Sequence, residues 1–387
     1  MAEADASLER LLDSLTAPGE LYTPRADGAL TCYACGHRCL IKPGRRGICQ
    51  VRFNAAGALR VPWGYVGALQ CDPTEKKPFF HVYPGSDTLT FGMLGCDLHC
   101  SYCQNWVTSQ ALRDPASALA GAYPREVTPE QLAALAVQNG AALVGSSYNE
   151  PLITSEWAVA VFKASIAAGL KCVYISNGNA TPAVLDYLQP YVSGYKVDLK
   201  TMSDKNYRRL GAVLTNVLDT LRGVHARGMW LEVVTLVIPG FNDSAAELTD
   251  AARFLAALSP DIPWHVTAFH PDYKMQGPDP TRAAALVRAA EIGRAAGLRY
   301  VYAGNLPGQV GDWEHTFCPG CGHRLIARSG YRILEYALTA EGACPQCGAR
   351  PAGLWTNNPA SVRRFGPGAP RPVSGSSSRR HRSDLAR

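Results

Sequence analysis

The chain has 387 residues, 47% of them hydrophobic, which is enough to bury a sizeable core in one large domain with smaller modules beside it. The formal net charge is +6, but the stretch from Thr356 to Arg387 holds seven Arg and one Asp and so carries the whole excess. The remaining chain is balanced in charge, which excludes a body that attracts nucleic acid through a global positive field.

The sequence contains no apolar run near the roughly 20 residues of a membrane span. Met1 to Glu20 is amphipathic and lacks the apolar region of a signal peptide. We therefore expect a cytoplasmic protein with no membrane contact and no specific nucleic-acid partner. In a reducing compartment, thirteen cysteines indicate metal ligands rather than disulfides. Cys71 and Cys172 stand apart from the other cysteines and are interpreted as small buried hydrophobes.

Residues 1–87 are predicted to form an N-terminal cysteine-rich module. A short helix is expected within residues 1–30, where leucines recur at helical spacing. Four cysteines then follow within 18 residues, a strong metal-binding pattern: Cys32, Cys35, Cys39 and Cys49. The set could hold zinc or a second iron–sulfur cluster, and its spacing does not separate the two. Residues 50–87 are predicted to be irregular, and the polar run Asp72–Pro78 is interpreted as a solvated face, with a place on a substrate path as the alternative.

Residues 88–310 alternate strand and helix patterns, which indicates parallel strands joined by right-handed crossovers. Capping boxes are expected at Thr128 and at Ser244 with Glu247. The pattern favours a partial (β/α)6 barrel, with an open doubly wound sheet as the rival; both place function at the carboxyl ends of the strands. The predicted strands are Thr88–Leu94, Ala141–Ser146, Cys172–Ser176, Gly194–Leu199, Trp230–Ile238 and His265–Phe269, with Arg299–Ala303 as a seventh.

Three cysteines follow the first of these strands at the spacing C-x3-C-x2-C: Cys96, Cys100 and Cys103. Iron–sulfur clusters usually take four thiolates, so three would leave one iron of a [4Fe-4S] cluster without a protein ligand. Such an open position is typical of catalytic metal sites. It could take the amino and carboxylate groups of S-adenosylmethionine (SAM). The alternatives are a zinc knuckle or three unrelated thiols.

Polar side chains follow the later strands and should converge at one rim of the barrel. Glu150 suits the SAM ammonium group, Lys200 its carboxylate, and Asn177 and Asp198 its ribose or amino acid portion. His265 could contact the adenosyl group or move a proton as a catalytic residue. Asn149 and Ser176 complete the predicted cofactor-binding set. As alternatives, Asn149 and Asn177 could cap helices, and Glu232 could be an ion-pair partner inside the barrel.

A family resemblance runs through these residues. The cysteine triplet with Tyr102 resembles the cluster signature of the radical SAM superfamily, and Tyr148–Pro151 resembles the acidic motif that binds the SAM amino group there. The pattern Asp198-Leu199-Lys200 followed by His265 resembles that of glycyl-radical-enzyme activases, including the pyruvate formate-lyase activating enzyme. Over residues 30–355 the chain is most similar to AmmeMemoRadiSam-system radical SAM proteins, through Asp72–Gly85, Cys103-Gln104-Asn105-Trp106 and Gly304-Asn305.

Residues 311–355 carry a C-x2-C pair at Cys318 and Cys321 and a second pair at Cys344 and Cys347. This pattern predicts a zinc ribbon in which four thiolates hold one zinc ion. A module this small needs the metal in order to fold, because its core is too small. A rubredoxin-like iron site is the alternative. From Thr356 to Arg387, Pro, Gly, Ser and Arg dominate, and this part is predicted to be a disordered basic tail.

The resemblance implies a radical SAM enzyme that cleaves SAM reductively at a [4Fe-4S] cluster. Its 5′-deoxyadenosyl radical would take hydrogen from an unknown small-molecule or protein substrate, and an external donor of the flavodoxin or ferredoxin type would supply the electron. One alternative is a glycyl-radical-enzyme activase, whose substrate is a backbone glycine. Another is a non-enzymatic zinc-ribbon protein that binds a partner or acts as a scaffold.

Overall fold

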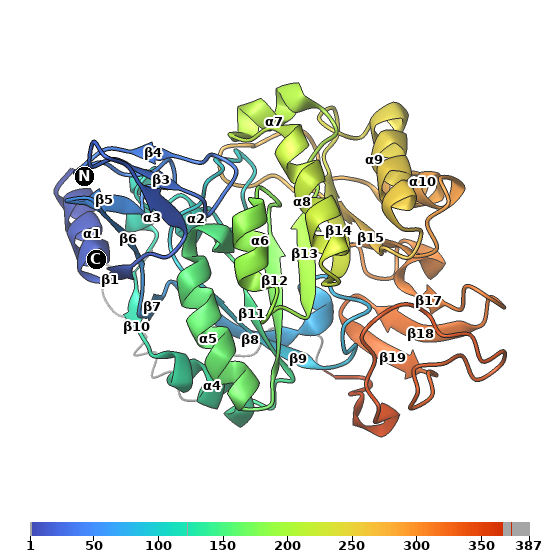
Figure 1. The fold of residues 1–387 in the computed structure, drawn as a ribbon. Coiled ribbons are helices and arrows are strands. Elements are labelled where there is room, and N and C mark those ends of the chain that lie inside the picture. Colours follow the sequence, from blue (N-terminus) through green and yellow to red (C-terminus); the bar gives the residue numbers. More distant parts are fainter. Residues whose placement is uncertain (1, 122, 367–372, 374–387) are drawn as a thin grey trace, which may run out of the picture.

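The structure, a computed structural model, describes residues 2–121, 123–366 and 373. An eight-stranded sheet lies at its centre, in the order β16-β15-β14-β13-β12-β11-β9-β8 (Figure 1). All neighbours pair in parallel except β8, which is antiparallel to β9 at one edge. The seven parallel strands lie where the sequence predicts strands, and the α/β partial barrel is confirmed. The strands are β8 Ala68–Pro73, β9 Asp87–Gly92, β11 Leu143–Ser146, β12 Lys171–Ser176, β13 Gly194–Asp198, β14 Trp230–Val237, β15 Trp264–Ala268 and β16 Val301–Gly304.

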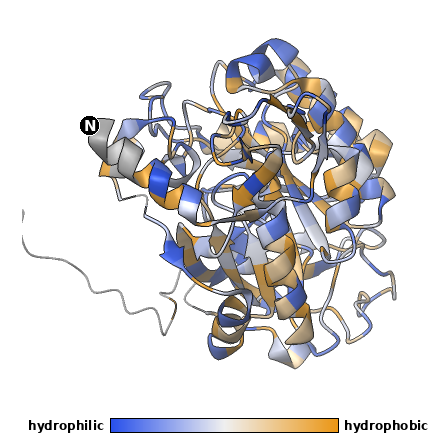
Figure 2. Cartoon of the chain, turned by 60° about the vertical axis from the view of Figure 1, so that its left-hand side comes forward, coloured by the Kyte–Doolittle hydropathy of each residue, from blue (hydrophilic) through white to orange (hydrophobic). Residues whose placement is uncertain are grey.

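Helices connect the parallel strands and cover one face of the sheet, where α4, α5, α6 and α8 lie in front of the strands in Figure 1. Buried residues recur every three or four positions along them; in α9 they are Leu248, Ala251, Ala252 and Leu255. Hydrophilic and hydrophobic residues accordingly alternate along the helices in Figure 2. The helices are α4 Pro129–Gln138, α5 Ser155–Ala167, α6 Pro182–Leu188, α7 Asp204–Leu210, α8 Leu214–Ala226, α9 Ala245–Leu258 and α10 Ala283–Ala295, with the 3-10 turn η2 at Pro151–Thr154.

The two predicted capping boxes differ in outcome. Thr128 and Gln131 form a complete box at the start of α4, with both reciprocal hydrogen bonds. At α9 the Ser244 hydroxyl accepts from the Glu247 N–H as expected. The Glu247 carboxylate, however, binds the Met202 N–H and the Thr201 hydroxyl, so the second box is incomplete. The Glu247 side chain therefore makes a tertiary contact instead of the capping hydrogen bond that the local sequence pattern predicted.

The N-terminal module contains more strand than the sequence indicated. The predicted helix is α1, and the region predicted to be irregular, 50–87, holds four short strands and the 3-10 turn η1, so that prediction was wrong. The strands β5 to β7 are two to five residues long, too short for alternation of apolar and polar residues to be recognised. Elements of this part are α1 Ala2–Ser14, β1 Thr16–Pro18, β2 Tyr22–Pro24, β3 Leu30–Cys32, β4 Leu40–Ile41, β5 Phe53–Ala55, β6 Ala58–Pro62, β7 Tyr65–Val66 and η1 Thr74–Lys76. Between β9 and α4 lie α2 Trp106–Ser109, α3 Pro115–Leu119 and β10 Arg125–Glu126.

A buried ion pair joins this module to the barrel. The Arg52 guanidinium donates to both carboxylate oxygens of Glu156 on α5, at 2.7 and 2.8 Å. Both side chains are 1% exposed. Glu156 also accepts the backbone N–H groups of Glu20 and Leu21, so one carboxylate holds two separate segments of the module against α5.

The C-terminal module packs against the segment that leads into β9 and against β16. Arg328 on β18 donates to the Phe80 carbonyl of that segment at 2.8 Å, and the Thr316 hydroxyl lies 2.8 Å from the Tyr302 hydroxyl of β16. In the same segment as Phe80, the His81 ring bonds both the Ala352 carbonyl of the module and the Tyr302 hydroxyl, each at 2.6 Å. The module comprises η3 Gly311–Glu314, β17 Thr316–Phe317, β18 Arg324–Ser329 and β19 Arg332–Tyr336, and η4 Pro359–Ser361 follows it.

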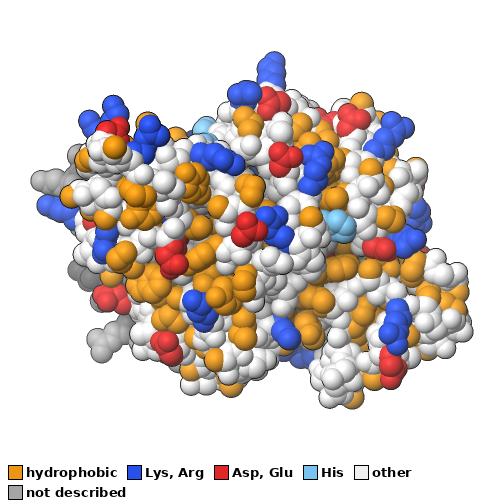
Figure 3. Space-filling model, viewed as in Figure 1, with side chains coloured by type: hydrophobic (Ala, Val, Ile, Leu, Met, Phe, Trp, Pro, Cys, Tyr) orange, Lys and Arg blue, Asp and Glu red, His pale blue; other side chains and the backbone are white. Residues whose placement is uncertain are grey.

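The predicted disordered tail begins at Thr356, and its described part makes defined contacts. Arg363 forms an ion pair with Asp87, the first residue of β9, and Val362 is buried. Residues 367–372 and 374–387, with most of the tail's arginines, lie outside the described residues. On the face seen in Figure 3, charges of both signs are interspersed over the surface, as the balanced composition of the body predicts.

Candidate active site

One cavity of about 400 Å³ lies on the inner face of the sheet. Because successive strand residues point to opposite faces, Lys196 and Asp198 of β13 line it, whereas Tyr195 and Val197 between them are buried in the core. The cavity brings together the triplet and every residue of the predicted SAM set: Cys96, Cys100, Cys103, Asn149, Glu150, Ser176, Asn177, Asp198, Lys200 and His265. These residues converge because the carboxyl ends of parallel strands meet at one edge of the sheet. The individual role of each residue stays a prediction.

The triplet lies on the loop after β9. Gly95 has φ +94°, and a Cβ there would lie 2.9 Å from Val51 and 3.2 Å from the Cys49 carbonyl, so the turn needs glycine. The Cys96 sulfur accepts the Leu98 N–H at 3.4 Å, and the Cys103 sulfur lies 3.2 Å from the Ser109 hydroxyl. Three thiols on one loop, with these donors near their sulfurs and the open cavity beside them, fit an incompletely ligated iron–sulfur cluster.

Glu150 is the most heavily bonded residue of the predicted SAM set. It is 2% exposed, and its carboxylate accepts from the Ser176 hydroxyl at 2.8 Å, the Asn177 N–H at 2.6 Å and the Leu152 N–H at 3.0 Å. Burial, with a contribution from nearby Asp97, raises the pKa of Glu150 to about 8. A carboxylate has about four acceptor sites, so one remains for a ligand cation, which would favour the charged form.

The helix-cap alternative for the two asparagines was wrong. Glu150 caps η2, and Thr181 caps α6. Asn149 instead accepts the Met93 N–H at 3.1 Å, and Asn177 donates to Asp97 at 2.7 Å. Both asparagines therefore tie the loops after β11 and β12 to the segment that carries the triplet.

The end of β13 places one carboxylate between two lysines. Asp198 forms an ion pair with Lys196, and the Lys200 Nζ lies 3.6 Å from its other oxygen. Burial alone would raise the pKa of Asp198, but the two ammonium groups outweigh it and lower the pKa. Lys196 lies two residues before Asp198 on the same face of the strand, and this spacing could have identified it as a site residue from the sequence.

His265 is held by Glu232 inside the barrel, through a hydrogen bond from a neutral ring and not through the ion pair that the alternative for Glu232 predicted. The His265 Nε2 lies 2.7 Å from the Glu232 carboxylate, and both side chains are at most 2% exposed. Glu232 also accepts the N–H groups of Phe80 and His81. Burial lowers the pKa of His265 below its usual value, against the pull of Glu232, so the ring is neutral at pH 7.

The polar run Asp72–Pro78 is not a solvated face. Asp72, Glu75 and Lys77 are at most 5% exposed, and Glu75, Lys76, Lys77 and Pro78 line the cavity. The interpretation as a charged surface loop was therefore wrong. The run turns inward because Asp72, the penultimate residue of the edge strand β8, is buried and pairs there with Lys77.

The four N-terminal cysteines are gathered next to the triplet. Cys32, Cys35 and Cys49 are buried and Cys39 is half-buried. The Gly36 N–H donates to the Asn179 carbonyl at 2.7 Å, and Asn179 in turn donates to Asp97 of the triplet loop at 2.9 Å. Among the described residues, no three of these cysteine sulfurs lie within 4.8 Å of one another, so the metal in this set stays a prediction.

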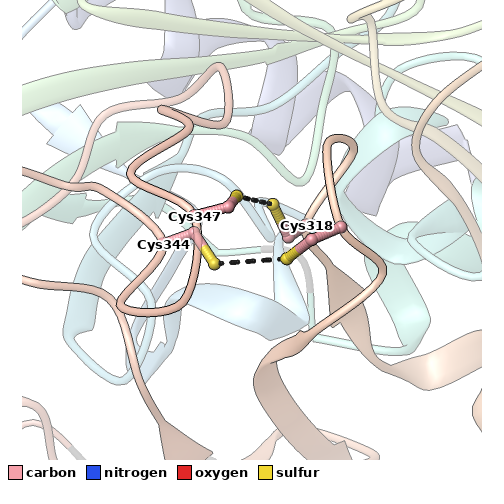
Figure 4. A group of neighbouring side chains, drawn as sticks. Cys318, Cys344 and Cys347 are labelled. Atoms are coloured by element: carbon pink, nitrogen blue, oxygen red, sulfur yellow. Dashed lines mark hydrogen bonds between the residues drawn. The ribbon is translucent and has the colours of Figure 1, made fainter.

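The C-terminal quartet has the geometry of a single-ion site. The sulfurs of Cys318, Cys321, Cys344 and Cys347 all lie within 4.8 Å of one another (Figure 4). Tetrahedral zinc with bonds of about 2.3 Å spaces its sulfurs by roughly 3.8 Å. The separations of 3.5 Å for Cys318–Cys347 and 3.7 Å for Cys321–Cys344 match this. The glycine after each second cysteine, Gly322 or Gly348, has φ +74°, so the two knuckles have the same turn.

We expect Cys344→Ser to lower the zinc content of the purified protein and to expose the C-terminal module to protease. One of the four predicted ligands would be lost, and small modules of this kind commonly depend on a bound metal to fold. Elemental analysis and limited proteolysis measure the two effects. Chelation of the unaltered protein should reproduce the cleavage pattern; a chelated protein that resists protease would contradict a structural metal.

Comparison with known proteins gives the family. Residues 91–254 match the family model described as Radical SAM superfamily. An uncharacterized protein of Methanocaldococcus jannaschii, MJ0808, is 34% identical over 335 residues, which cover 85% of this chain and 97% of that protein. The chain belongs to the radical SAM superfamily. It is a radical SAM enzyme whose substrate is unknown, and the non-enzymatic scaffold alternative was wrong.

Other proteins match over shorter stretches. The isethionate sulfite-lyase activating enzyme of Oleidesulfovibrio alaskensis is 32% identical over 100 residues, 24% of this chain and 31% of that enzyme. Among solved structures, a radical SAM methyltransferase from Sphaerobacter thermophilus has 19% identity and a TM-score of 0.43, over 58% of this chain and 68% of that one. A domain of a pyruvate-formate lyase-activating enzyme from Bacteroides vulgatus has 21% identity and a TM-score of 0.37, over 42% of this chain and 98% of that domain.

In the described part of this chain, helices are too short or too polar to cross a membrane.

Proposed function

We propose that Cys96, Cys100 and Cys103 hold a [4Fe-4S] cluster and that SAM occupies the adjoining part of the cavity. The observation that carries this is the shared cavity, which collects the three thiols and the polar strand ends on one inner face of the sheet. When bound, the cluster and SAM supply a 5′-deoxyadenosyl radical, which abstracts a hydrogen atom from the substrate.

The chain's own residues bind and orient SAM in this proposal. The remaining acceptor site of Glu150 takes the ammonium group, and Lys200 takes the carboxylate. Asn177 and Asp198 face the ribose, and Asn149 and Ser176 hold the loops that carry these groups. Neutral His265, fixed by Glu232, can accept a proton or contact the adenosyl group. The buried walls of the cavity exclude water from the radical.

The proposed context is an AmmeMemoRadiSam-type system that acts on a small molecule or a protein, with electrons from a flavodoxin or ferredoxin. A glycyl-radical-enzyme activase is the second candidate, favoured by the match to the isethionate sulfite-lyase activating enzyme over 100 residues. The position of the N-terminal cysteines, before the triplet instead of after it, weighs against the second candidate.

The test is anaerobic reconstitution of the full chain with iron and sulfide, followed by dithionite and SAM. We expect 5′-deoxyadenosine and methionine, measured by chromatography. A protein with a complete cluster that forms neither product would refute the proposed function. Incubation with candidate glycyl-radical enzymes, followed by electron paramagnetic resonance, separates the two substrate classes.

We expect Glu150→Gln to weaken SAM binding at least tenfold while the cluster still assembles. The amide keeps the size of the side chain but loses the charge that pairs with the SAM ammonium group, and its NH₂ group opposes the donors that now bind the carboxylate. Equilibrium binding of SAM to the reconstituted protein measures the effect. Glu130→Gln, on the outer surface of α4, is the matched control. Equal SAM affinity in the two variants would remove Glu150 from the proposed site.

A further inference from the structure

Residues 75–78 of the run from Asp72 to Pro78 line the cavity but have no part in the proposed SAM site. In the pairing of β8 with β9, Asp72 lies opposite Thr88 and Pro73 opposite Asp87, at the start of β9. The triplet follows the other end of the same strand. The six residues of β9 span roughly 17 Å at about 3.3 Å per residue, so Asp72 and Pro73 lie at the strand end away from the triplet. The Lys77 ammonium reaches back along the strand to the Tyr148 hydroxyl, and Tyr148 packs against Gly92 at the end that precedes the triplet.

Two lysines share one carboxylate in this run. The Lys77 Nζ forms an ion pair with Asp72 and donates to the Tyr148 hydroxyl at 3.0 Å. The Lys76 Nζ donates to the other Asp72 oxygen at 3.2 Å and to Gln70 at 3.5 Å. An ammonium group has three N–H donors. Each ammonium group has a third donor beyond these bonds; the Lys77 Nζ also lies 4.7 Å from the centroid of the Tyr148 ring, and Lys76 is partly exposed to solvent.

Counted with Asp72 alone, the two lysines leave one positive charge, and the carboxyl groups of Glu75 and Glu314 line the same cavity. Burial lowers the pKa of Lys77 to about 8, so Lys77 is charged at neutral pH and below. Lys77 is 5% exposed, and the side chain of Lys76 is 27% exposed. Glu75 adds little negative charge below neutral pH, because burial raises its pKa to about 7. A purely structural ion pair would match one lysine with one carboxylate, since a buried cation without a partner destabilises the folded state. Here the second cation lines a cavity, where an incoming anion can pair with it.

We propose that Lys76 and Lys77 form a subsite that binds an acidic group of the substrate, a carboxylate or a phosphate. The proposal rests on the proposed function, since it concerns the substrate of the same cavity. Tyr331, at the turn between β18 and β19, also lines this cavity, and its hydroxyl lies 3.4 Å from Asn305. It offers a neutral hydrogen-bond partner beside the lysines. An acid bound here would leave the rest of the substrate extended along β9 toward the triplet.

The experiment uses the full chain, reconstituted without oxygen and saturated with SAM, in a buffer of constant ionic strength. Inorganic phosphate and succinate are titrated separately by calorimetry, which distinguishes a phosphate from a carboxylate subsite. We expect saturable binding of at least one anion, weakened tenfold or more by Lys76→Gln and by Lys77→Gln. Lys77→Arg, which keeps the charge, should recover most of the affinity. Lys205→Gln, an exposed lysine on α7, is the matched control and should bind as the unaltered protein does.

Three results would overturn the subsite: no saturable binding of either anion, equal binding by the Gln variants and the control, or a parallel loss of SAM affinity that assigns the lysines to the cofactor. Lys76 is half-buried, so its variant keeps the test valid if Lys77→Gln fails to fold. Formation of 5′-deoxyadenosine is measured on the same samples. If it persists without anion binding, only the subsite is refuted; anion binding without it refutes the proposed function alone.

Discussion

Cys100→Ala is expected to abolish formation of 5′-deoxyadenosine. Cys100 is the central member of the triplet and is buried within the cavity wall, so alanine removes one of the three predicted thiolate ligands. Iron–sulfur clusters depend on their thiolates, and a cluster with two protein ligands should be lost or unstable. Iron and sulfide content, the cluster's absorption, and product formation are measured on anaerobically reconstituted protein.

Cys172→Ala provides the matched control, because Cys172 is equally buried but lies on β12 within the core. It should keep full iron content and activity. If Cys100→Ala retained its cluster and its product, the assignment of the triplet would fail. If both variants lost activity because they unfold, a lowered midpoint of thermal unfolding would show it. Cys100→Ser would then separate loss of the thiolate ligand from loss of side-chain packing.

The largest effect on stability is expected from Glu156→Ala. The variant leaves the Arg52 guanidinium buried without its carboxylate and frees the N–H groups of Glu20 and Leu21. Removing one partner of a buried ion pair costs about 3–5 kcal/mol, because the remaining charge is uncompensated. We expect a clear fall in the midpoint of thermal unfolding, measured by circular dichroism, and earlier proteolysis of the N-terminal module.

Asp219→Ala is the comparison, since Asp219 pairs with Arg222 on the exposed face of α8. Exposed pairs contribute little, so its midpoint should stay close to that of the unaltered protein. The double variant Arg52→Met with Glu156→Leu should recover much of the loss, because it removes both charges together. If Glu156→Ala and Asp219→Ala had equal midpoints of thermal unfolding, the Arg52 guanidinium would not be left uncompensated. Water would then have to reach it.

The sequence predicted the barrel well because its strands carry strong local signals. Each parallel strand is a short apolar run between turn residues, and the carboxyl ends of such strands meet at one edge. This is why residues as distant in the chain as Cys96 and His265 could be expected in one cavity, where both lie. The C-terminal quartet could be predicted for a similar reason, since two knuckles of fixed spacing determine their own geometry.

Tertiary contacts explain what the sequence did not reveal. The charges of Asp72 and Lys77 neutralise each other, and the residues between them give no local sign that the run folds inward. The Glu247 carboxylate is drawn from its cap by Thr201 and Met202, which are distant in sequence. Tyr331 reaches the cavity only because its module docks on the barrel, which no periodicity could have indicated.

The docking of the C-terminal module has a consequence for how substrate enters. The incomplete barrel is open between the segment before β9 and strand β16, and the His81 ring bridges these two sides by bonding the Tyr302 hydroxyl. The module contacts both sides, through Arg328 at the Phe80 carbonyl and through Thr316 at the Tyr302 hydroxyl. Loss of the module would remove these contacts, so admission of substrate would depend on residues far in sequence from the cysteine triplet.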